Sequence, residues 1–382
     1  MSSPDQPRTP QGHPHEPQGR ARRHTSWRAR LLLFGAGCVL ALAFGEAGAR
    51  ALAWTREQKI VADWQRIERG QGDQAEILLP DTETTLGRLV RTSDVPDIIY
   101  EFIPNLRARY LGQPCLINAH GFRDGEWPAP ERTPGSTRIV LLGDSVLFGW
   151  GVAQEQAFGR VMADRLRSAL PGRTIEVLNT GVPGYNTAME VATLEHKVLP
   201  WRPDIVLLDW VGNDTDLPNM IARQTGVLSF DRSYLYELVR KVLGWRTRWI
   251  DTPLQMAPFQ GERFESRPEH VPEIYRHMVG EEGVARAFER LAELSREHGF
   301  RVAVTCHFDL PDFVRDLCKQ HGWPTIENGD NLRVWMQQHD VTLPQYRECE
   351  LVIGNGDPHP SPMAHRMFGE LLADTLRTMA WL

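Results

Sequence analysis

The sequence predicts an α/β protein in which a parallel sheet of about five strands lies between two layers of helices. From residue 138 onward, short apolar runs typical of buried strands alternate with stretches of helical periodicity, and this alternation is typical of a parallel sheet. Several of these runs end at glycine or at small polar residues, as expected at the carboxyl ends of strands, where open α/β folds place their active sites. The candidate strands are residues 138–143, 174–179, 204–210, 301–306 and 324–327.

Four amphipathic stretches predict the helices that lie between and after these strands. In the first, Phe158, Val161, Met162 and Leu166 recur at a spacing of three to four residues, which puts them on one face of a helix over 157–170. The other predicted helices are residues 187–199, 283–298 and 362–379. Helices on both faces of the sheet complete the three layers.

An insertion over residues 216–275 interrupts this alternation between the third and fourth strands. Its aromatic residues include Tyr234, Tyr236, Trp245, Trp249 and Phe259. We expect most of them to pack in the core of a cap. A pocket for an acyl chain or a sugar is the alternative, because tryptophan and tyrosine stack on sugars as readily as they are buried against lipid.

The N-terminal region predicts a membrane anchor. Residues 1–30 are expected to form a disordered basic tail, and an uninterrupted apolar and glycine stretch begins at Leu31 and ends at Gly45. These fifteen residues are short for a bilayer, which requires about 20, so we extend the segment to 31–54. The extension includes Glu46 and Arg50, whose charges could snorkel to the membrane interface.

The same region leaves a second interpretation open, namely a signal peptide cleaved at the small residues Ala47-Gly48-Ala49. The arginine excess before the apolar stretch puts the N-terminus inside the cell. Both interpretations export the rest of the chain to the periplasm or the exterior. Residues 55–137 are expected to form an N-terminal extension that packs on the main domain, residues 138–382.

Composition excludes several classes of protein. The 382 residues are 41% hydrophobic and 24% charged, as in a folded chain, with a net charge of −6. The first thirty residues carry about +4, so the remainder is near −10, which argues against a nucleic-acid surface. Neither histidine nor cysteine shows the spacing of metal ligands, and no phosphate-binding loop is present, so we expect no metal and no cofactor. The spacing of Cys115, Cys306, Cys318 and Cys349 leaves disulfide bonds open.

The first predicted strand ends at Gly143-Asp144-Ser145, the feature on which the functional prediction rests. A serine at the carboxyl end of a buried strand is a candidate nucleophile if a base and oxyanion donors lie nearby. The N–H of Ser145 and the start of the following helix can face a developing oxyanion. Without such partners, a loop serine is the ordinary explanation of this tripeptide.

Other strand ends and helix starts supply candidate partners. Gly181 and Gly184 follow the second strand, and glycines let backbone N–H groups approach a ligand closely. Asn213 follows the third strand and can donate an N–H to an oxyanion. His359 precedes the last helix and is the candidate base, with Asp357 to orient it. Each of these residues taken alone has an ordinary alternative as a turn, a cap or a surface side chain.

Four further polar residues near these motifs are expected to support them. Asp144 and Asp214 belong to the motifs but are more suited to stabilising turns. His365 lies within the last predicted helix, so we interpret it as structural. His307 ends the fourth strand, either as a hydrogen-bonded residue of the wall or as part of the pocket.

Taken in order, Gly-Asp-Ser, a glycine, Gly-x-Asn-Asp and Asp-x-His-Pro resemble the motifs of the SGNH (GDSL-type) hydrolases over roughly residues 138–380. The resemblance implies a three-layer α/β/α, flavodoxin-like fold. It implies that the nucleophile also gives its own N–H to the oxyanion, that a glycine N–H and an asparagine side chain are further donors, and that the histidine is the base. The residues in these roles are Ser145, Gly184, Asn213, His359 and its partner Asp357.

One position departs from the family pattern. The acid usually lies three residues before the histidine, but that position is Gly356 here, and Asp357 lies two residues before His359. Some members resemble this shorter spacing, and some work with a serine–histidine dyad. Gly181 remains an alternative to Gly184.

We therefore expect an exported serine esterase that hydrolyses an acyl ester, with acetyl as the favoured acyl group. One alternative is an O-acetyltransferase or deacetylase acting on cell-envelope polysaccharide. A transferase would need a donor-supplying partner, because the sequence has one anchor segment only. Another alternative is a non-catalytic glycan-binding scaffold, and a thioesterase or phospholipase stays open. The expected partners are the ester substrate and, through the N-terminal helix, the membrane.

Overall fold

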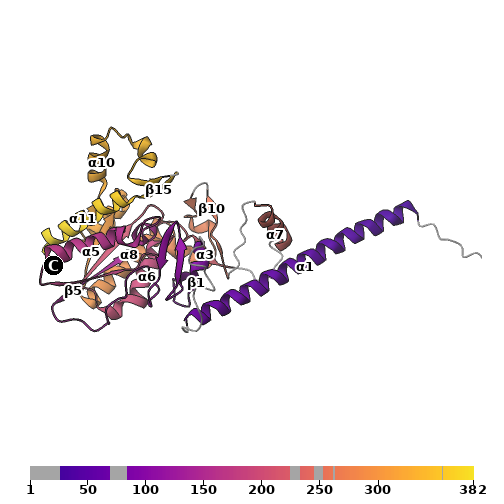
Figure 1. The fold of residues 1–382 in the computed structure, drawn as a ribbon, viewed down its shortest axis with the longest axis horizontal. Coiled ribbons are helices and arrows are strands. Elements are labelled where there is room, and N and C mark those ends of the chain that lie inside the picture. Colours follow the sequence, from indigo (N-terminus) through magenta and orange to yellow (C-terminus); the bar gives the residue numbers. More distant parts are fainter. Residues whose placement is uncertain (1–25, 69–83, 224–232, 245–252, 261–262, 355) are drawn as a thin grey trace, which may run out of the picture.

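The structure is a computed structural model that describes residues 26–68, 84–223, 233–244, 253–260, 263–354 and 356–382 (Figure 1). Residues 1–25 of the expected 1–30 tail, Trp245, Trp249 and parts of the expected insertion lie outside these residues. The side chain of Phe259 is not described either. The end of the expected tail, from Trp27, is helical and not disordered, because it forms the first turn of α1 (Trp27–Glu68).

A five-stranded parallel sheet forms the centre of the protein, as predicted. Its strands are β5 (Ser136–Leu142), β6 (Thr174–Asn179), β7 (Ile205–Trp210), β12 (Arg301–Cys306) and β13 (Thr325–Glu327). They are ordered β13-β12-β7-β5-β6, and every neighbouring pair is parallel. The chain order therefore reverses between β5 and β7, and such a reversal is where open α/β sheets bind ligands, at the carboxyl ends of the strands.

Helices cover both faces of this sheet because alternate residues of each strand point to opposite sides. On one face, Ile139 and Leu141 pack with apolar residues of α5 (Phe158–Ala169) and α11 (Pro362–Thr378). On the other face, Val140 and Leu142 share a core with α6 (Thr187–Thr193), α8 (Gly280–His298) and α9 (Asp312–His321). The strands are buried on both sides, which explains why they read as continuous apolar runs.

The helix predicted over 187–199 is shorter than expected. Helix α6 ends at Thr193 and continues as a π-turn, η2 (Leu194–Val198), and a 3₁₀ turn, η3 (Leu199–Trp201). Pro200 lies in this last turn, and a proline ring has no N–H to extend the α-helical ladder.

Smaller elements surround the sheet. Residues before the sheet form α3 (Leu86–Leu89) and two antiparallel pairs, β1 (Val90–Thr92) with β2 (Tyr100–Phe102) and β3 (Arg107–Tyr110) with β4 (Gln113–Leu116). The inserted region contains β8 (Met220–Ala222) paired with β9 (Leu254–Met256), α7 (Tyr234–Val242), and β10 (Phe259–Gln260) paired with β11 (Arg263–Phe264). After the sheet follow α10 (Gly329–Gln338) and the antiparallel pair β14 (Val352–Gly354) and β15 (Asp357–Pro360). The short helical turns are α4 (Ser145–Phe148), η1 (Gln154–Gln156), η4 (Pro268–His270), η5 (Glu273–Met278) and η6 (Leu343–Glu348).

The N-terminal apolar segment and the residues that follow it form one continuous helix. Helix α1 (Trp27–Glu68) has 42 residues and extends away from the sheet and the helices that cover it (Figure 1). By length and composition its portion Trp27–Ala62 could cross a membrane. A core helix or a signal sequence would pass the same test.

Candidate active site

The turn after β5 that carries Ser145 is packed so closely that position 143 has no room for a side chain. A Cβ on Gly143 would lie 2.8 Å from the Cβ of Leu147 and 3.2 Å from that of Asp209. The Asp144 side chain caps the short helix α4 by accepting a hydrogen bond from Val146 N at 3.0 Å. Ser145 follows at the first position of α4, mostly buried but with access to a pocket. The expectation that Asp144 stabilises this turn is therefore confirmed.

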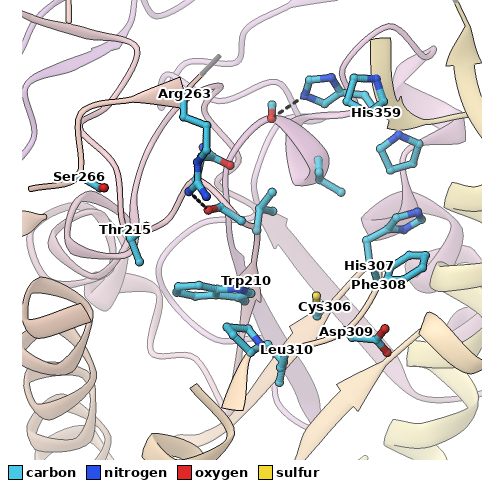
Figure 2. Close-up of a pocket in the computed structure, with 18 of the residues that line it drawn as sticks. Trp210, Thr215, Arg263, Ser266, Cys306, His307, Phe308, Asp309, Leu310 and His359 are labelled. Carbon is cyan, nitrogen blue, oxygen red and sulfur yellow. Dashed lines mark hydrogen bonds between the residues drawn. The ribbon is translucent and has the colours of Figure 1, made fainter. Parts of the chain in front are cut away.

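His359 lies directly opposite this serine. Its Nε2 is 2.9 Å from Ser145 Oγ, although the two residues are 214 positions apart in the sequence (Figure 2). Its Nδ1 is 2.5 Å from Asp357 Oδ1, which also accepts a hydrogen bond from the His359 backbone N–H at 3.0 Å. Serine, histidine and aspartate therefore form one continuous hydrogen-bonded chain.

The spacing of two residues between acid and base follows from the local backbone. Asp357 and His359 both belong to β15, and residues i and i+2 of a strand point to the same side. An acid three residues before the histidine would need a bend or a turn to reach the same nitrogen. Burial by itself raises the pKa of Asp357, but hydrogen bonds from His359 and Trp150 outweigh it and hold the pKa at about 2. The carboxylate is therefore ionised wherever the imidazole can act as a base.

Trp150 is a neighbour of this chain that sequence reasoning missed. Its Nε1 donates to Asp357 Oδ2 at 2.9 Å, and its ring stacks on that of His359 with a centroid distance of 4.8 Å and an interplanar angle of 18°. The tryptophan thus fixes both the acid and the base. Its position between two glycines just after the nucleophile, Gly149-Trp150-Gly151, was the available signal.

The predicted oxyanion donors lie at different distances from the pocket. Asn213 lines it together with Ser145, and its Nδ2 donates to Asp144 Oδ2 at 3.0 Å. Because a carboxamide carries two N–H donors, this bond orients the side chain and leaves the second N–H for a ligand. Gly184 is not among the residues that line the pocket. Its φ is +76°, and a Cβ there would lie 2.2 Å from Asn219 Cγ, so this position requires glycine.

Gly181, the alternative to Gly184, has its amide already engaged. Its N–H donates to Asn179 Oδ1 at 2.8 Å, and a Cβ would lie 2.5 Å from Phe148 N. This glycine lets the second loop pack closely against the nucleophile turn. Asp214 has the supporting role that we expected, since its Oδ2 accepts from Val211 N at 2.7 Å.

A cavity of about 980 Å³ opens beside the serine and histidine (Figure 2). Aromatic side chains, among them Trp210, Phe308 and Phe313, contribute to its walls, and Arg263 lies at the edge opposite His307. Arg263, from the described part of the insertion, places a positive charge in the pocket wall. Tyr234 and Tyr236 of the insertion lie on α7 and do not line the pocket. The aromatic residues of the pocket come from the ends of β7 and β12 and from α9 and η6, and not from the described part of the insertion.

The other two histidines near the site are neutral. His307 lines the pocket, which was one of the two possibilities, but neither of its ring nitrogens has a partner among the described residues. The expectation of a hydrogen-bonded wall residue was therefore wrong, because the side chain is enclosed by apolar neighbours such as Phe368. Burial lowers the pKa of His307 to about 3. His365 is structural, as expected: its Nδ1 accepts from Phe158 N at 3.3 Å, and burial keeps its pKa well below 6.5.

The N-terminal extension supports the site from behind. The buried guanidinium of Arg123 donates to the carbonyl oxygens of Phe148, Gly149 and Val152, at 2.9 to 3.0 Å, and so binds the turn that carries Ser145. Asp124 accepts from Asn179 N at 3.0 Å and binds the second loop in the same way. Neither residue was among the site residues predicted from the sequence.

A group of carboxylates is buried beneath the site. Glu190 is 1% exposed, and neither of its carboxylate oxygens has a hydrogen-bond partner among the described residues. Burial raises its pKa well above the ordinary 4.5, and the negative charges of Asp214, Asp144 and Asp209 raise it further. A carboxylic acid with a raised pKa in the folded state gives most stability at low pH, and this contribution is lost as the pH rises from 4.5 toward the folded pKa.

Glu190→Gln is therefore expected to make the protein more stable at about pH 8, with a melting temperature higher by a few degrees, and to flatten the dependence of stability on pH. Glutamine cannot ionise, and its amide offers donors beside Asp214 Oδ1, which lacks a partner among the described residues. Thermal unfolding of the full chain in detergent at about pH 5 and pH 8 measures this. The matched control is Glu297→Gln at an exposed position, which should change neither curve. An unchanged profile for Glu190→Gln would contradict a proton held at this residue.

The described residues contain no cluster of three or more histidine, cysteine, aspartate or glutamate side chains that could hold a metal ion. All five cysteines are free thiols, so none of the four outside α1 forms a disulfide bond in this structure.

The fold and the site define an α/β protein with a serine, a histidine and an aspartate in hydrogen-bond contact at the carboxyl edge of its sheet. The sequence matches the model of the GDSL-like lipase/acylhydrolase family over residues 141–367, more than half of the chain, and the protein belongs to this family. Membership assigns it to the hydrolases that act on ester bonds.

Among solved structures, the chain is similar to a G-D-S-L family lipolytic protein from Desulfitobacterium hafniense DCB-2, at 13% identity and a TM-score of 0.37, over 63% of this chain and 100% of that one. It is similar to a lipase/acylhydrolase from Enterococcus faecalis at 16% identity and a TM-score of 0.36, over 64% and 96% of the two chains. An acetyl xylan esterase shows 12% identity and a TM-score of 0.38, over 63% and 99%. No curated protein matches the sequence.

Proposed function

We propose that the protein is an exported serine esterase that hydrolyses an acyl ester, with acetyl as the favoured acyl group, by a Ser145–His359–Asp357 mechanism. The observation that carries the proposal is the unbroken hydrogen-bonded chain from Ser145 Oγ through the imidazole to Asp357 Oδ1, at 2.9 and 2.5 Å. Nucleophile, base and orienting acid within this reach are what serine acyl transfer requires.

In the first half of the reaction, Ser145 Oγ attacks the ester carbonyl carbon and its proton passes to Nε2 of His359. The Nδ1–H of the resulting imidazolium stays bonded to Asp357, whose negative charge stabilises the cation. The carbonyl oxygen becomes an oxyanion and accepts N–H groups from Ser145 and Asn213, which line the pocket. The third donor in this proposal is the N–H of Gly184, which rests on the family pattern because this glycine does not line the pocket. When the tetrahedral intermediate collapses, the C–O bond to the alcohol breaks and His359 gives its proton to the leaving oxygen.

In the second half, water replaces the alcohol. His359 takes a proton from the water, whose oxygen attacks the acyl carbon bonded to Ser145 Oγ. Collapse of this second intermediate releases the carboxylic acid and returns the proton to the serine. Asp144 orients both the donor and the nucleophile, because its Oδ2 accepts hydrogen bonds from the Asn213 amide and from Ser145 Oγ, each at 3.0 Å.

The size of the cavity supports a substrate with a bulky alcohol part. About 980 Å³ is far more than an acetyl group fills, and it lies at the upper end of ordinary ligand pockets. An acetylated cell-envelope glycan would combine a small acyl group with a large leaving group. If a glycan hydroxyl, and not water, attacked the acyl-enzyme, the same site would transfer the acetyl group to the glycan. Mass spectrometry of glycan acetylation separates these two outcomes, since transfer adds acetyl groups and hydrolysis removes them.

We further propose that residues 31–54 form an uncleaved signal anchor, with the catalytic domain outside the cytoplasm. Cleavage after Ala49 would remove Glu46, whose side chain bonds to the start of α7. Retention of the N-terminal segment in the mature membrane-bound protein, measured by mass spectrometry, tests this proposal. A mature N-terminus at residue 50 would refute it.

Asn213→Ala is expected to lower kcat for p-nitrophenyl acetate by about 10²–10³-fold, with a smaller change in KM, because the lost N–H acts mainly on the oxyanion of the transition state. Asn331→Ala, at an exposed asparagine on α10, is the matched control and should keep wild-type kinetics. A kcat that stays within a few-fold of wild type would remove Asn213 from the proposed oxyanion hole. Failure of a fluorophosphonate probe to label wild-type Ser145 would instead favour the non-catalytic scaffold.

A further inference from the structure

Helix α7 of the insertion lies alongside the N-terminal helix α1, apart from the catalytic pocket (Figure 1). The Glu46 carboxylate of α1 accepts hydrogen bonds from Ser233 Oγ at 2.7 Å and from the backbone N–H groups of Tyr234 and Leu235, both at 2.9 Å. An acidic side chain from one helix thus satisfies the free N–H groups at the start of the other. A Cβ on Gly45 would lie 3.0 Å from Leu235 Cδ2, so this position helps the two helices to approach closely.

Arg50, the second charged residue of the anchor segment, has its partners at the same contact between α1 and α7. Arg50 Nε lies 2.7 Å from Glu46 Oε1, and its guanidinium lies 4.9 Å from the centroid of the Tyr234 ring. Ala49, Ala53 and Tyr234 are buried against one another. The two ionised residues that oppose membrane insertion of 31–54 therefore pair with each other and with α7, which lowers the cost of keeping them in an apolar environment.

The face of α7 that continues away from this contact is apolar and exposed. At 100° per residue, Val239, Leu243 and Tyr236 fall on an arc that adjoins the residues packed on α1, and Val242 lies in line with the packed Leu238, one turn further along the helix. They are 45%, 78%, 54% and 57% exposed, respectively. The charged residues of the helix lie on the opposite arc: Glu237, Arg240 and Lys241. Half of one apolar arc is thus covered by α1, and the other half is open.

The apolar surface of α1 just before its contact with α7 is also exposed. Leu40, Leu42 and Phe44, which directly precede Gly45, are exposed by 58%, 63% and 75%. With Glu46 and Arg50 satisfied, the membrane segment can include residues 31–54, which at 1.5 Å per residue span about 36 Å, enough for a hydrocarbon core of about 30 Å. Trp54 then lies where tryptophan is favoured, at the membrane–water interface.

We propose that α7 is an interfacial membrane helix, whose exposed arc of Val239, Val242, Leu243 and Tyr236 inserts into the lipid beside α1. The proposal rests on the anchor part of the proposed function. An amphipathic helix that lies in the interface keeps its apolar face in the acyl chains and its basic residues at the headgroups, and Arg240 and Lys241 suit anionic headgroups. Together with the ion pair of Glu57 and Arg223 at 2.7 Å, this contact holds the catalytic domain close to the membrane surface.

The test uses the full chain in vesicles of phosphatidylcholine and phosphatidylglycerol. Val242→Cys is labelled with the fluorophore NBD in a Cys38→Ala, Cys349→Ala background, since the other three cysteines are buried. We expect the NBD emission to shift to the blue and to lose most of its intensity when the lipids carry a nitroxide near the headgroup end of the acyl chain. Hydrolysis of p-nitrophenyl acetate by the labelled protein shows that the fold is intact.

Two further labelled sites make the outcomes distinct. NBD at Val334→Cys, a 51% exposed valine on α10, should not be quenched, and NBD at the native Cys38 should be quenched most by a nitroxide deep in the bilayer. An unquenched label at Val242 together with a quenched label at Cys38 overturns the proposal and leaves the anchor in place. If neither is quenched, the anchor fails as well. Energy transfer between labels at Val242 on different chains, without quenching by lipid, would assign the arc to contact with a second copy and also overturn the proposal.

Discussion

Ser145→Ala is expected to lower kcat for p-nitrophenyl acetate by about 10⁴–10⁶-fold, the range over which loss of a nucleophile or another triad member reduces serine acyl transfer. No other hydroxyl replaces it, because α4 begins at this residue and Val146 follows directly. The remaining oxyanion donors and the pocket would still bind the ester, so KM should change much less than kcat.

Two controls make this result specific. Ser168→Ala removes an exposed hydroxyl of α5 that donates to Asp164 O, and it should leave the rate unchanged. Thermal unfolding of Ser145→Ala should match that of the wild type or exceed it, since an active site that buries Asp144 and Ser145 together is not optimised for stability. A rate equal to that of the wild type would refute Ser145 as nucleophile, whatever the substrate proves to be.

Asp357→Asn is expected to lower kcat by about 10⁴-fold. A carboxamide has no negative charge to stabilise the imidazolium. Its NH₂ group would face the Nδ1–H of His359, donor against donor, and so favour the tautomer with the proton on Nε2, which cannot accept the serine proton. Stopped assays of p-nitrophenyl acetate hydrolysis from about pH 5 to pH 9 measure the loss. Because the pKa of Asp357 is about 2, its own titration should contribute no limb to the wild-type profile in that range.

The same variant carries a stability prediction with a definite sign. Asp357 has a pKa below its ordinary 3.8, so its ionised form stabilises the folded state above that pH, and the contribution is lost as the pH falls toward 2. The unfolding transitions of wild type and Asp357→Asn should therefore converge under acid conditions. Asp316→Asn, at an exposed aspartate paired with Lys319, is the control. If the loss in kcat is less than about tenfold, the site works as a serine–histidine dyad.

Much of the fold could be predicted from the sequence because the pattern of apolar residues is local. All five strands of the sheet occur within two residues of their predicted bounds, since strands buried on both faces have no polar alternation to obscure them. Helices α5, α8 and α11 also lie within a few residues of their predicted positions. What a local pattern could not reveal was that the apolar segment and the stretch after it form one 42-residue helix, or that α7 packs on it.

The candidate site was predictable to the extent that its residues lie in short motifs at strand ends. Trp150, Arg123 and Glu190 were missed as parts of the site because their roles depend on partners far away in the sequence. The tryptophan bonds to a residue 207 positions away, and the arginine binds a turn 25 residues further on. Single positions of this kind carry no periodic signal, so only the packed structure reveals them.

The sequence by itself determined a parallel α/β sheet, a serine at the end of its first strand, and an apolar N-terminal segment with two charges in it. Only the tertiary structure decided how these parts satisfy one another. An acid two residues before His359 reaches the imidazole because β15 is extended there, and the two charges of the apolar N-terminal segment, Glu46 and Arg50, pair with each other and with the start of α7. In both cases, the free-energy cost of burying an ionised group depends on hydrogen-bond donors and charges within a few ångströms. Which residues come this close in space cannot be read from their order along the chain.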